Sequence, residues 1–266
     1  MSITPTWEHY GTHDDSAYPE LWEGCIGAWC PGLGPTGLVV PNLARTALPG
    51  GAFVDLSAAT GWEVDGGAYC ALTTSNTGYV DFGFTFPSMS ELTQTAWIRK
   101  SSGARAVILA FVGGTGQIGF ELYETTAYTD VADGVYGYFN SNLTGWHHWT
   151  LVFCGPATGN SNRLKAYVDG IEMAMTYQGT VGTTIGPSVH TYGTRRSGYS
   201  PIVPVARYDD ILVFNRALAA GEVEILARQR AIAYTPRRQR RFYSIPAGFP
   251  FWARQSTPRV IGGGLV

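Results

Sequence analysis

The sequence predicts an all-β protein, an antiparallel sandwich of two sheets followed by one short helix and an extended C-terminal arm. Apolar and polar residues alternate over strand-length runs through most of the 266 residues. The 34 Gly and 15 Pro punctuate these runs as turns. The 15 Tyr, 12 Phe and 8 Trp favour strands. Because no strand–helix–strand rhythm is present, an antiparallel sandwich or barrel is expected.

The strand pattern recurs along the body of the chain. Asp169-Gly170 lies between two strand-like runs and predicts a two-residue type I′ turn, because Gly accepts the positive φ that this turn requires. The candidate strands are residues 24–30, 68–74, 78–82, 92–99, 106–112, 117–123, 134–140, 146–154, 164–168, 172–176, 189–193 and 204–215.

One amphipathic helix is expected over residues 219–232, and Pro236 ends regular structure soon after it. Its predicted inner side, by i, i+3, i+4, i+7 spacing, consists of Val223, Leu226, Ala227 and Arg230. No internal repeat or second core is visible. The expected organisation is an N-terminal arm (1–20), a sandwich domain (21–233) and a C-terminal arm (234–266).

Charge is unevenly distributed. Residues 236–266 carry six Arg and no Asp, Glu or Lys, so the rest of the chain has a net charge of −8. Charged residues make up 14%, against ~25% in typical soluble domains, so we expect partners to cover much of the surface. The N-terminus lacks a signal-peptide pattern and no apolar run reaches the ~20 residues that span a bilayer. Synthesis in the cytoplasm, without a membrane partner, is expected.

The four cysteines show no metal-ligand spacing. Cys25 and Cys30 are five residues apart, so on one strand they would point to opposite faces and could not form a disulfide. Buried free thiols are expected at Cys25, Cys30, Cys70 and Cys154.

Three stretches carry a recognisable set of motifs: "GWHHWTLVFCG", "NRLKAYVDGIEM" and "RYDDILVFNRALAAGEVEIL". They resemble the laminin G-like jelly rolls of the concanavalin A-like lectin/glucanase superfamily over roughly residues 21–232. The resemblance implies a two-sheet jelly roll. The matching positions are Trp146, His148, Tyr167, Val168, Asp169, Gly170, Asp209, Asp210, Asn215, Arg216, Ala217, Leu218 and Glu222.

The two ends of the chain, "GAWCPGLGPTG" and a basic, Gly-rich finish, are similar to those of laminin G-like proteins from phage genomes. That resemblance implies a virion structural role, as a capsid decoration protein or a tail or fibre accessory.

Glycoside hydrolysis is the less favoured alternative. Retaining glycosidases need two carboxylates about 5–5.5 Å apart, and in "WEVDGG" Glu63 and Asp65 share one strand face. No third carboxylate follows, and Gly66-Gly67 interrupts the strand. We interpret both as loop-edge acids and expect no catalytic residue.

No resident metal or other cofactor is expected, although Ca²⁺ stays an alternative at Asp209-Asp210. Calcium needs 6–8 oxygen ligands and no clustered ligand loop is visible. The favoured interpretation is structural: one Asp pairs with Arg207 or Arg216, and the other caps a loop.

Two histidine pairs are weak metal candidates. Adjacent residues on a strand face opposite ways, so His147 and His148 cannot chelate one metal together. One of these rings is expected to be buried against Trp146 or Trp149. The spacing of His9 and His13 suits a helix that their segment does not predict.

Glycan binding is the principal alternative function. The loop over residues 190–201, "HTYGTRRSGYSP", offers aromatic rings for stacking beside cationic groups. The candidate glycan contacts are Tyr192, Arg195, Arg196 and Tyr199.

The C-terminal arm has three interpretations. Its arginines and aromatics could bind nucleic acid, but the acidic body would repel phosphates. Disorder would require few aromatics. The favoured interpretation is an extended arm that docks on other virion subunits in an oligomeric assembly, with aromatics in pockets and arginines on acidic surface. Its predicted contact residues are Arg237, Arg238, Arg240, Arg241, Phe242, Tyr243, Phe249, Phe251, Trp252 and Arg254.

Overall fold

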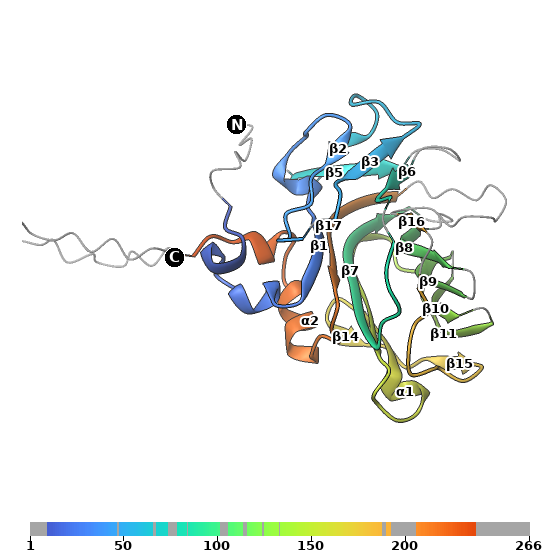
Figure 1. Cartoon of the computed structure of the whole chain (residues 1–266). Coiled ribbons are helices and arrows are strands. Elements are labelled where there is room, and N and C mark those ends of the chain that lie inside the picture. The colour runs from blue at the N-terminus through green and yellow to red at the C-terminus, as the bar shows by residue number, and fades with distance from the viewer. Residues whose placement is uncertain are drawn as a thin grey trace, which may run out of the picture.

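The computed structural model is a two-layer antiparallel sandwich, and the first and last described residues, Tyr10 and Arg237, lie on the same side of it (Figure 1). It describes residues 10–46, 48–65, 68–73, 79–83, 85–101, 106–113, 116–123, 125–132, 134–187, 190–192 and 206–237. The strand pairings in this part of the chain are antiparallel. The all-β sandwich is thereby confirmed.

The first layer is an eight-stranded sheet in the order β14-β13-β12-β7-β17-β5-β4, with β1 also paired to β17. Its central strands are the long ones, which explains why their sequence patterns were the clearest. The strands are β1 (Cys25–Trp29), β4 (Trp62–Asp65), β5 (Ala68–Thr73), β7 (Glu91–Lys100), β12 (Gly145–Cys154), β13 (Leu164–Val168), β14 (Ile171–Glu172) and β17 (Ala206–Phe214).

The second layer is a nine-stranded sheet in the order β15-β11-β10-β9-β8-β16-β6-β3-β2. Its strands are β2 (Val39–Val40), β3 (Gly51–Val54), β6 (Tyr79–Asp81), β8 (Ala106–Gly113), β9 (Gly116–Leu122), β10 (Thr126–Ala132), β11 (Val135–Asn140), β15 (Thr176–Gln178) and β16 (His190–Tyr192). The predicted list lacked β2, β3 and β10 of this sheet and β4 of the other. The predicted return strand over 172–176 was wrong in extent: β14 ends at Glu172, and β15 joins the other sheet.

The predicted hairpin turn is confirmed. Asp169 has φ of 50° and Gly170 has φ of 82°, as a type I′ turn requires. The carboxylate of Asp169 also accepts a hydrogen bond from the backbone N–H of His148, at 2.9 Å. This second contact fixes the turn against β12, the strand paired with β13.

The predicted helix is shorter than expected. The helix α2 spans Ala220–Leu226, with Val223 and Leu226 buried. It cannot continue to residue 232 because Ala231 takes a left-handed conformation, with φ of 59°. A second short helix, which the sequence did not predict, is α1 (Asn160–Arg163). Four 3-10 turns complete the helical elements of the described residues: η2 (His13–Asp15), η3 (Pro19–Trp22), η4 (Pro31–Leu33) and η5 (Ile232–Tyr234).

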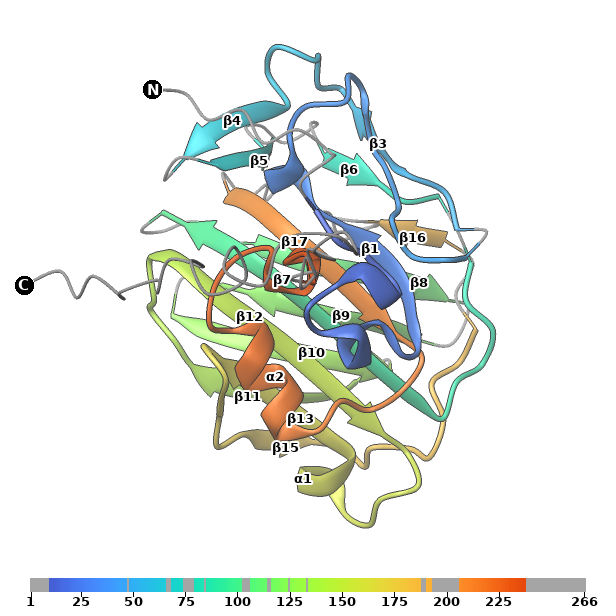
Figure 2. The ribbon, with the colours of Figure 1, turned by 90° about the vertical axis from the view of Figure 1, so that its left-hand side faces the viewer.

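The central strands of the eight-stranded sheet are buried on both faces. On β17, Ile211 and Val213 face the core between the sheets, whereas Leu212 and Phe214 face a second apolar cluster outside them. That outer cluster includes Trp22 and Val223. Figure 2 shows α2 and the N-terminal turns lying over this outer face.

The outer cluster also joins the two ends of the described chain. The hydroxyl of Ser16 donates to the carbonyl of Ala233 at 2.6 Å, and Ser16 and Pro236 form an isolated β-bridge. The backbone N–H of Arg237 donates to the carbonyl of Asp15 at 2.7 Å. We call residues 11–17 and 233–237 the terminal junction. The described part of the predicted N-terminal arm therefore packs on the chain's own C-terminal segment.

Tyr234, which the sequence analysis assigned to the C-terminal arm, is fully buried in the outer cluster. The packed body thus extends past residue 233. Among the described residues, no helix is long and apolar enough to cross a membrane.

Candidate functional site

A cluster of tyrosines covers part of the outward face of the nine-stranded sheet. Three rings lie close together on β10 and β11: Tyr128 is stacked with Tyr138 at 5.8 Å between centroids, and edge-on to Tyr136 at 5.6 Å. Tyr123, just after β9, meets Tyr128 edge-on at 5.1 Å. All four are partly exposed. We call Tyr123, Tyr128, Tyr136 and Tyr138 the tyrosine face.

These rings point outward because side chains on a strand alternate between its two faces. Along β10, Ala127, Thr129 and Val131 are buried while the residues between them are partly exposed. Along β11, Phe139 packs in the core and its neighbour Tyr138 faces outward. Cross-strand register then brings Tyr128 directly opposite Tyr138, so the cluster results from strand pairing rather than from sequence proximity.

Carboxylates lie directly across from two of these tyrosines on neighbouring strands. Glu121 on β9 lies opposite Tyr128, and Asp130 lies opposite Tyr136. The hydroxyl of Tyr123 donates to Glu121 Oε2 at 2.9 Å. The face thus combines flat aromatic rings, which can stack on a sugar ring or attract a cation, with carboxylates that accept hydrogen bonds. The sequence analysis missed it, although Tyr136 and Tyr138 at a spacing of two were a visible signal.

The predicted glycan loop is only partly described. Tyr192 occupies a backbone position on β16 opposite Ala110 and Asp81. Ala110 is paired with Gly119, and Gly119 with Asp130. The backbone of Tyr192 therefore belongs to the same cross-sheet row as Asp130. The predicted contacts Arg195, Arg196 and Tyr199 lie outside the described residues.

The two acids considered for hydrolysis form ion pairs with arginines. Arg207 Nε lies 2.7 Å from Glu63 Oε2 and 3.3 Å from Asp65 Oδ2. Arg99 also pairs with Asp65. The guanidinium groups occupy lone pairs of both carboxylates, which suits a structural ion-pair cluster better than a catalytic pair that must contact a substrate. The interpretation as loop-edge acids was wrong in place, because both lie on β4.

As expected, one histidine of the pair is buried and the other is partly exposed, but the buried ring has a different aromatic neighbour. His148 is buried, and burial lowers its pKa to about 3. Its Nε2 lies 2.5 Å from the hydroxyl of Thr95, and its ring contacts Trp97 at 5.5 Å. The buried ring therefore packs on Trp97, whereas the predicted partner Trp149 lies edge-on to the other ring, His147, at 6.4 Å between centroids. His147 is partly exposed and pairs with Asp169 at 2.7 Å.

The predicted partners of Asp209 and Asp210 were wrong. Arg207 and Arg216 pair with other acids, and the nearby cation is Arg230, whose Nη1 lies 3.8 Å from Asp209 Oδ2. Asp209 accepts from the N–H of Gly32 at 2.7 Å, and Asp210 from the N–H of Ala231 at 3.0 Å. Burial raises the pKa of Asp209 to about 6. Burial, reinforced by the Asp209 charge, raises the pKa of Asp210 to about 8.

These aspartates do not form a recognisable cation site. Within the part of the chain that the structure describes, no group of three or more His, Cys, Asp or Glu side chains is arranged to hold a metal ion. His13 Nε2 lies 3.3 Å from the carbonyl of Leu43, and His9 lies outside the described residues. Cys25 and Cys30 are buried free thiols, as predicted, and Cys154 is free and partly buried. The side chain of Cys70 is not described.

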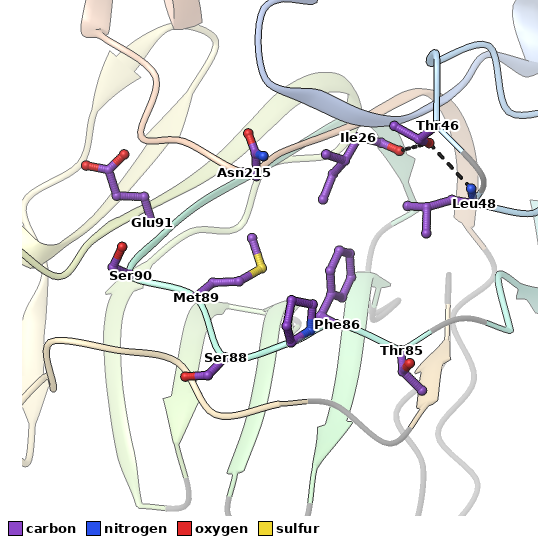
Figure 3. Close-up of a pocket in the computed structure, with 11 residues that line it drawn as sticks. Ile26, Thr46, Leu48, Thr85, Phe86, Ser88, Met89, Ser90, Glu91 and Asn215 are labelled. Carbon is purple, nitrogen blue, oxygen red and sulfur yellow. Dashed lines mark hydrogen bonds between the residues drawn. The ribbon is translucent and has the colours of Figure 1, made fainter.

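A pocket of about 440 Å³ opens at one end of the sandwich (Figure 3). Its apolar residues Ile26, Leu48, Phe86 and Met89 also pack against the core between the sheets. Pro87 and six polar residues line the rest of the pocket: Thr46, Thr85, Ser88, Ser90, Glu91 and Asn215. This size suits a small ligand or a single inserted side chain.

The predicted assembly arm is described only at its start. Arg237 is exposed at the end of the terminal junction. The remaining predicted contacts, Arg238, Arg240, Arg241, Phe242, Tyr243, Phe249, Phe251, Trp252 and Arg254, lie outside the described residues.

Comparison with known proteins agrees with the observed fold. A family model described as concanavalin A-like lectin/glucanases superfamily matches residues 66–224. No curated protein matches the chain in sequence. Among solved structures, the chain is similar to the receptor binding domain of botulinum neurotoxin C/D mosaic serotype, with a TM-score of 0.51 and 9% identity. It is also similar to a mutant Trypanosoma rangeli sialidase displaying trans-sialidase activity, with a TM-score of 0.50 and 15% identity.

These matches cover 77% of this chain but only 51% of the neurotoxin domain and 33% of the sialidase. The chain therefore spans between a third and a half of the proteins it resembles. At such identities the likeness concerns the fold alone.

Proposed function

Because the chain belongs to the concanavalin A-like lectin/glucanases superfamily, we propose that it is a non-catalytic, lectin-like display module of a larger assembly. Its terminal segments anchor it on neighbouring subunits. The tyrosine face binds glycan. The assembly that best fits the phage-like chain ends is a virion, in which the module decorates a capsid or accompanies a tail or fibre.

One observation carries this proposal: the anchor and the binding face lie on opposite sides of the sandwich. The terminal junction packs on the outer face of the eight-stranded sheet: Tyr234 is buried in the outer cluster, and the indole N–H of Trp22 donates to the carbonyl of Ala233. The tyrosine face lies on the outward side of the other sheet, with the core between them (Figure 1). A module held at its termini in this way presents Tyr128 and Tyr138 away from its support.

Charge supports the anchoring half of the proposal. The described chain ends at Arg237, and in the sequence residues 238–266 add five Arg and no acid. A basic and aromatic segment of this length can reach a neighbouring subunit, because extended chain spans about 3.3 Å per residue. Arginine and aromatic residues are the types that dominate binding energy at interfaces.

The alternative is a glycoside hydrolase, which we consider because the fold is similar to that of a sialidase. The arginine pairing of Glu63 and Asp65 favours the binding module instead. Incubation of the purified chain with a panel of glycans, followed by analysis of released sugars, tests this. Release that Glu63→Gln abolishes would contradict the proposal.

The binding half is tested on a glycan array with the full chain and with Tyr138→Ala. Loss of an aromatic stacking platform should reduce signal at least about fivefold, since each ring contributes on the order of 1 kcal/mol. Val64→Ala is the matched control, because Val64 is an exposed apolar side chain on the other sheet. Equal signals from all three proteins would overturn the tyrosine face as the site.

The anchoring half is tested by assembly. Particles purified from cells that make the chain should contain it, and a variant ending at Arg237 should keep the melting temperature of the full chain yet fail to join the particles. Incorporation of the shortened variant would overturn the anchoring role. Absence of the full chain from every particle fraction would overturn the virion assignment.

A further inference from the structure

We propose that the pocket at the end of the sandwich receives the Trp252 side chain of a second copy of this chain. This inference rests on the anchoring half of the proposed function, and it names the partner and the place of contact. Three observations carry it: the shape and polarity of the pocket, its position beside the terminal junction, and the composition of residues 238–266.

The pocket has an apolar interior. Four apolar side chains point toward one another across it (Figure 3): Ile26, Leu48, Phe86 and Met89. Ile26 lies in a β-bulge, because the register of β1 against β17 shifts between Cys25 and Gly27. Bulges re-aim side chains, and this one gives the pocket an apolar residue from the end of a strand. An inserted apolar ring would therefore lose water on several sides at once.

Hydrogen bonds hold the two opposite walls in place. On one wall, Met89 and Ile185 exchange two backbone hydrogen bonds, at 3.1 and 2.8 Å. On the other, the hydroxyl of Thr46 donates to the carbonyl of Ile26 at 2.7 Å. A pocket that is already formed loses little conformational entropy when it is filled, which favours binding.

Polar groups at the edge of the pocket favour a neutral ring that carries a hydrogen-bond donor. Glu91 is the one charged residue among those that line it. Its carboxylate accepts from the N–H of Ala217 at 3.4 Å and from the thiol of Cys154 at 3.7 Å, so it disfavours an anion by its charge without being a free ligand. Asn215 is exposed, and its side-chain amide forms no hydrogen bond with any described residue. The N–H of an indole can donate to this amide while the ring stays in the apolar interior.

The pocket lies beside the place where the described chain ends. Arg45 pairs with Asp14 of the terminal junction at 3.4 Å, and the next residue, Thr46, lines the pocket. The last described residue, Arg237, donates its backbone N–H to Asp15 in the same junction. The start of the arm and the pocket are thus close together on one molecule. Two copies that meet at this surface can exchange arms reciprocally, as a two-fold interface requires.

The sequence beyond Arg237 contains the matching side chain. Residues 238–266 hold five Arg, no acid and five aromatic residues, of which Trp252 is the only tryptophan. Tryptophan and arginine are enriched among the residues that dominate binding energy at interfaces. Trp252 is 15 residues beyond Arg237, so extended chain can carry it up to about 50 Å, far enough to reach a neighbour. The basic arm is also attracted to that neighbour, because the rest of the chain has a net charge of −8.

The first test measures self-association of the full chain by sedimentation velocity. We expect monomer at about 1 μM and a dimer at about 100 μM. Trp252→Ala and Met89→Gln should each weaken the association at least about tenfold, since both remove an apolar anchor contact. Phe242→Ala is the control within the arm. Met173→Gln is the control for the pocket, because Met173 is another partly buried methionine packed against the same core.

A second pair of variants tests the hydrogen bond. Trp252→Phe keeps a ring but lacks the N–H, and Asn215→Ala removes the acceptor, so each should weaken the association about threefold. Combining the two should weaken it no further than either alone, since both remove the same contact. Asn215 is exposed, so its substitution keeps the pocket testable if Met89→Gln fails to fold. Near-ultraviolet circular dichroism verifies the fold of each variant.

Mixing two variants decides whether the arm binds a second copy. Met89→Gln retains an intact arm, and Trp252→Ala retains an intact pocket. Neither should associate alone, but their mixture should form a two-copy species through the one intact contact. An arm that occupied the pocket of its own chain would give no such species.

Each alternative result has its own meaning. A full chain that stays monomeric at every concentration overturns the second copy as partner, as does a mixture that fails to associate. Association that Met89→Gln and Asn215→Ala leave unchanged overturns the pocket as the place of contact. The anchoring function is decided separately: a monomeric chain that joins particles only when residues 238–266 are present keeps its anchoring role and loses this inference.

Discussion

The guanidinium of Arg230 lies 3.8 Å from the carboxylate of Asp209, at the point where the chain leaves α2 for the terminal junction. Arg230 also donates to the carbonyl of Asp65 at 2.9 Å and lies 4.4 Å above the ring of Trp146. Asp209 is 1% exposed. A single arginine therefore connects the sandwich to the segment that we propose anchors it.

The first prediction concerns that arginine. Arg230→Met keeps an apolar stem over Trp146 but leaves the buried carboxylate of Asp209 without its nearby cation. We expect the free energy of unfolding to fall by about 2–3 kcal/mol, measured by urea denaturation. Arg228→Met is the control: its ion pair with Glu224 is exposed, so its loss should cost about 0.5 kcal/mol or less. Adding Asp209→Asn to Arg230→Met should recover part of the loss. Equal effects of the two single variants would contradict this account.

The second prediction concerns pH. The pKa of Asp210 is raised from 3.8 to about 8, so between these values the folded state binds more protons than the unfolded state. The free energy of unfolding therefore falls as pH rises. His148, whose pKa is lowered to about 3, has the opposite effect only below its ordinary value of 6.5. The window from pH 6.5 to 8 thus reports the aspartates.

Over that window the chain should lose up to about 2 kcal/mol of stability, the limit for one proton over 1.5 pH units. Asp210→Asn should remove most of this slope, because the amide does not titrate, and Asn tolerates the left-handed backbone at this position, where φ is 49°. Thermal melts at intervals of 0.5 pH units measure it. A wild-type chain that becomes more stable between pH 6.5 and 8 would refute the raised pKa.

The third prediction uses two glycines with similar backbones. Gly170 and Gly134 have φ of 82° and 71°, but a Cβ at Gly170 would lie 3.1 Å from the Cα of Glu224, whereas a Cβ at Gly134 meets nothing within 4 Å. Gly134→Ala should cost about 1 kcal/mol, the ordinary cost of a left-handed alanine. Gly170→Ala should cost more, because the hairpin must also move from α2. Chemical denaturation of both variants gives the difference in their free energies of unfolding. Equal losses would show that α2 shifts to accommodate the new Cβ at no cost.

Strand positions were predictable because alternation is a local property of the sequence. The runs around Trp149 and Leu164 contain bulky apolar residues at a spacing of two, so the strands β12 and β13 were found with bounds accurate to about one residue. The strand β10 was missed because its buried positions include Ala127 and Thr129, which are not strongly apolar. The end of α2 was missed because nothing in the sequence marks Ala231 for positive φ.

The sequence by itself determined the all-β class and the turn at Asp169-Gly170, since each depends on residues that are near one another in the chain. Only the tertiary structure decided that Arg230 is the partner of Asp209 and that Tyr128 lies beside Tyr138. These contacts depend on strand register, on packing across the sandwich and on which face of each sheet is covered. Long-range pairing fixes those choices, and no local pattern encodes it.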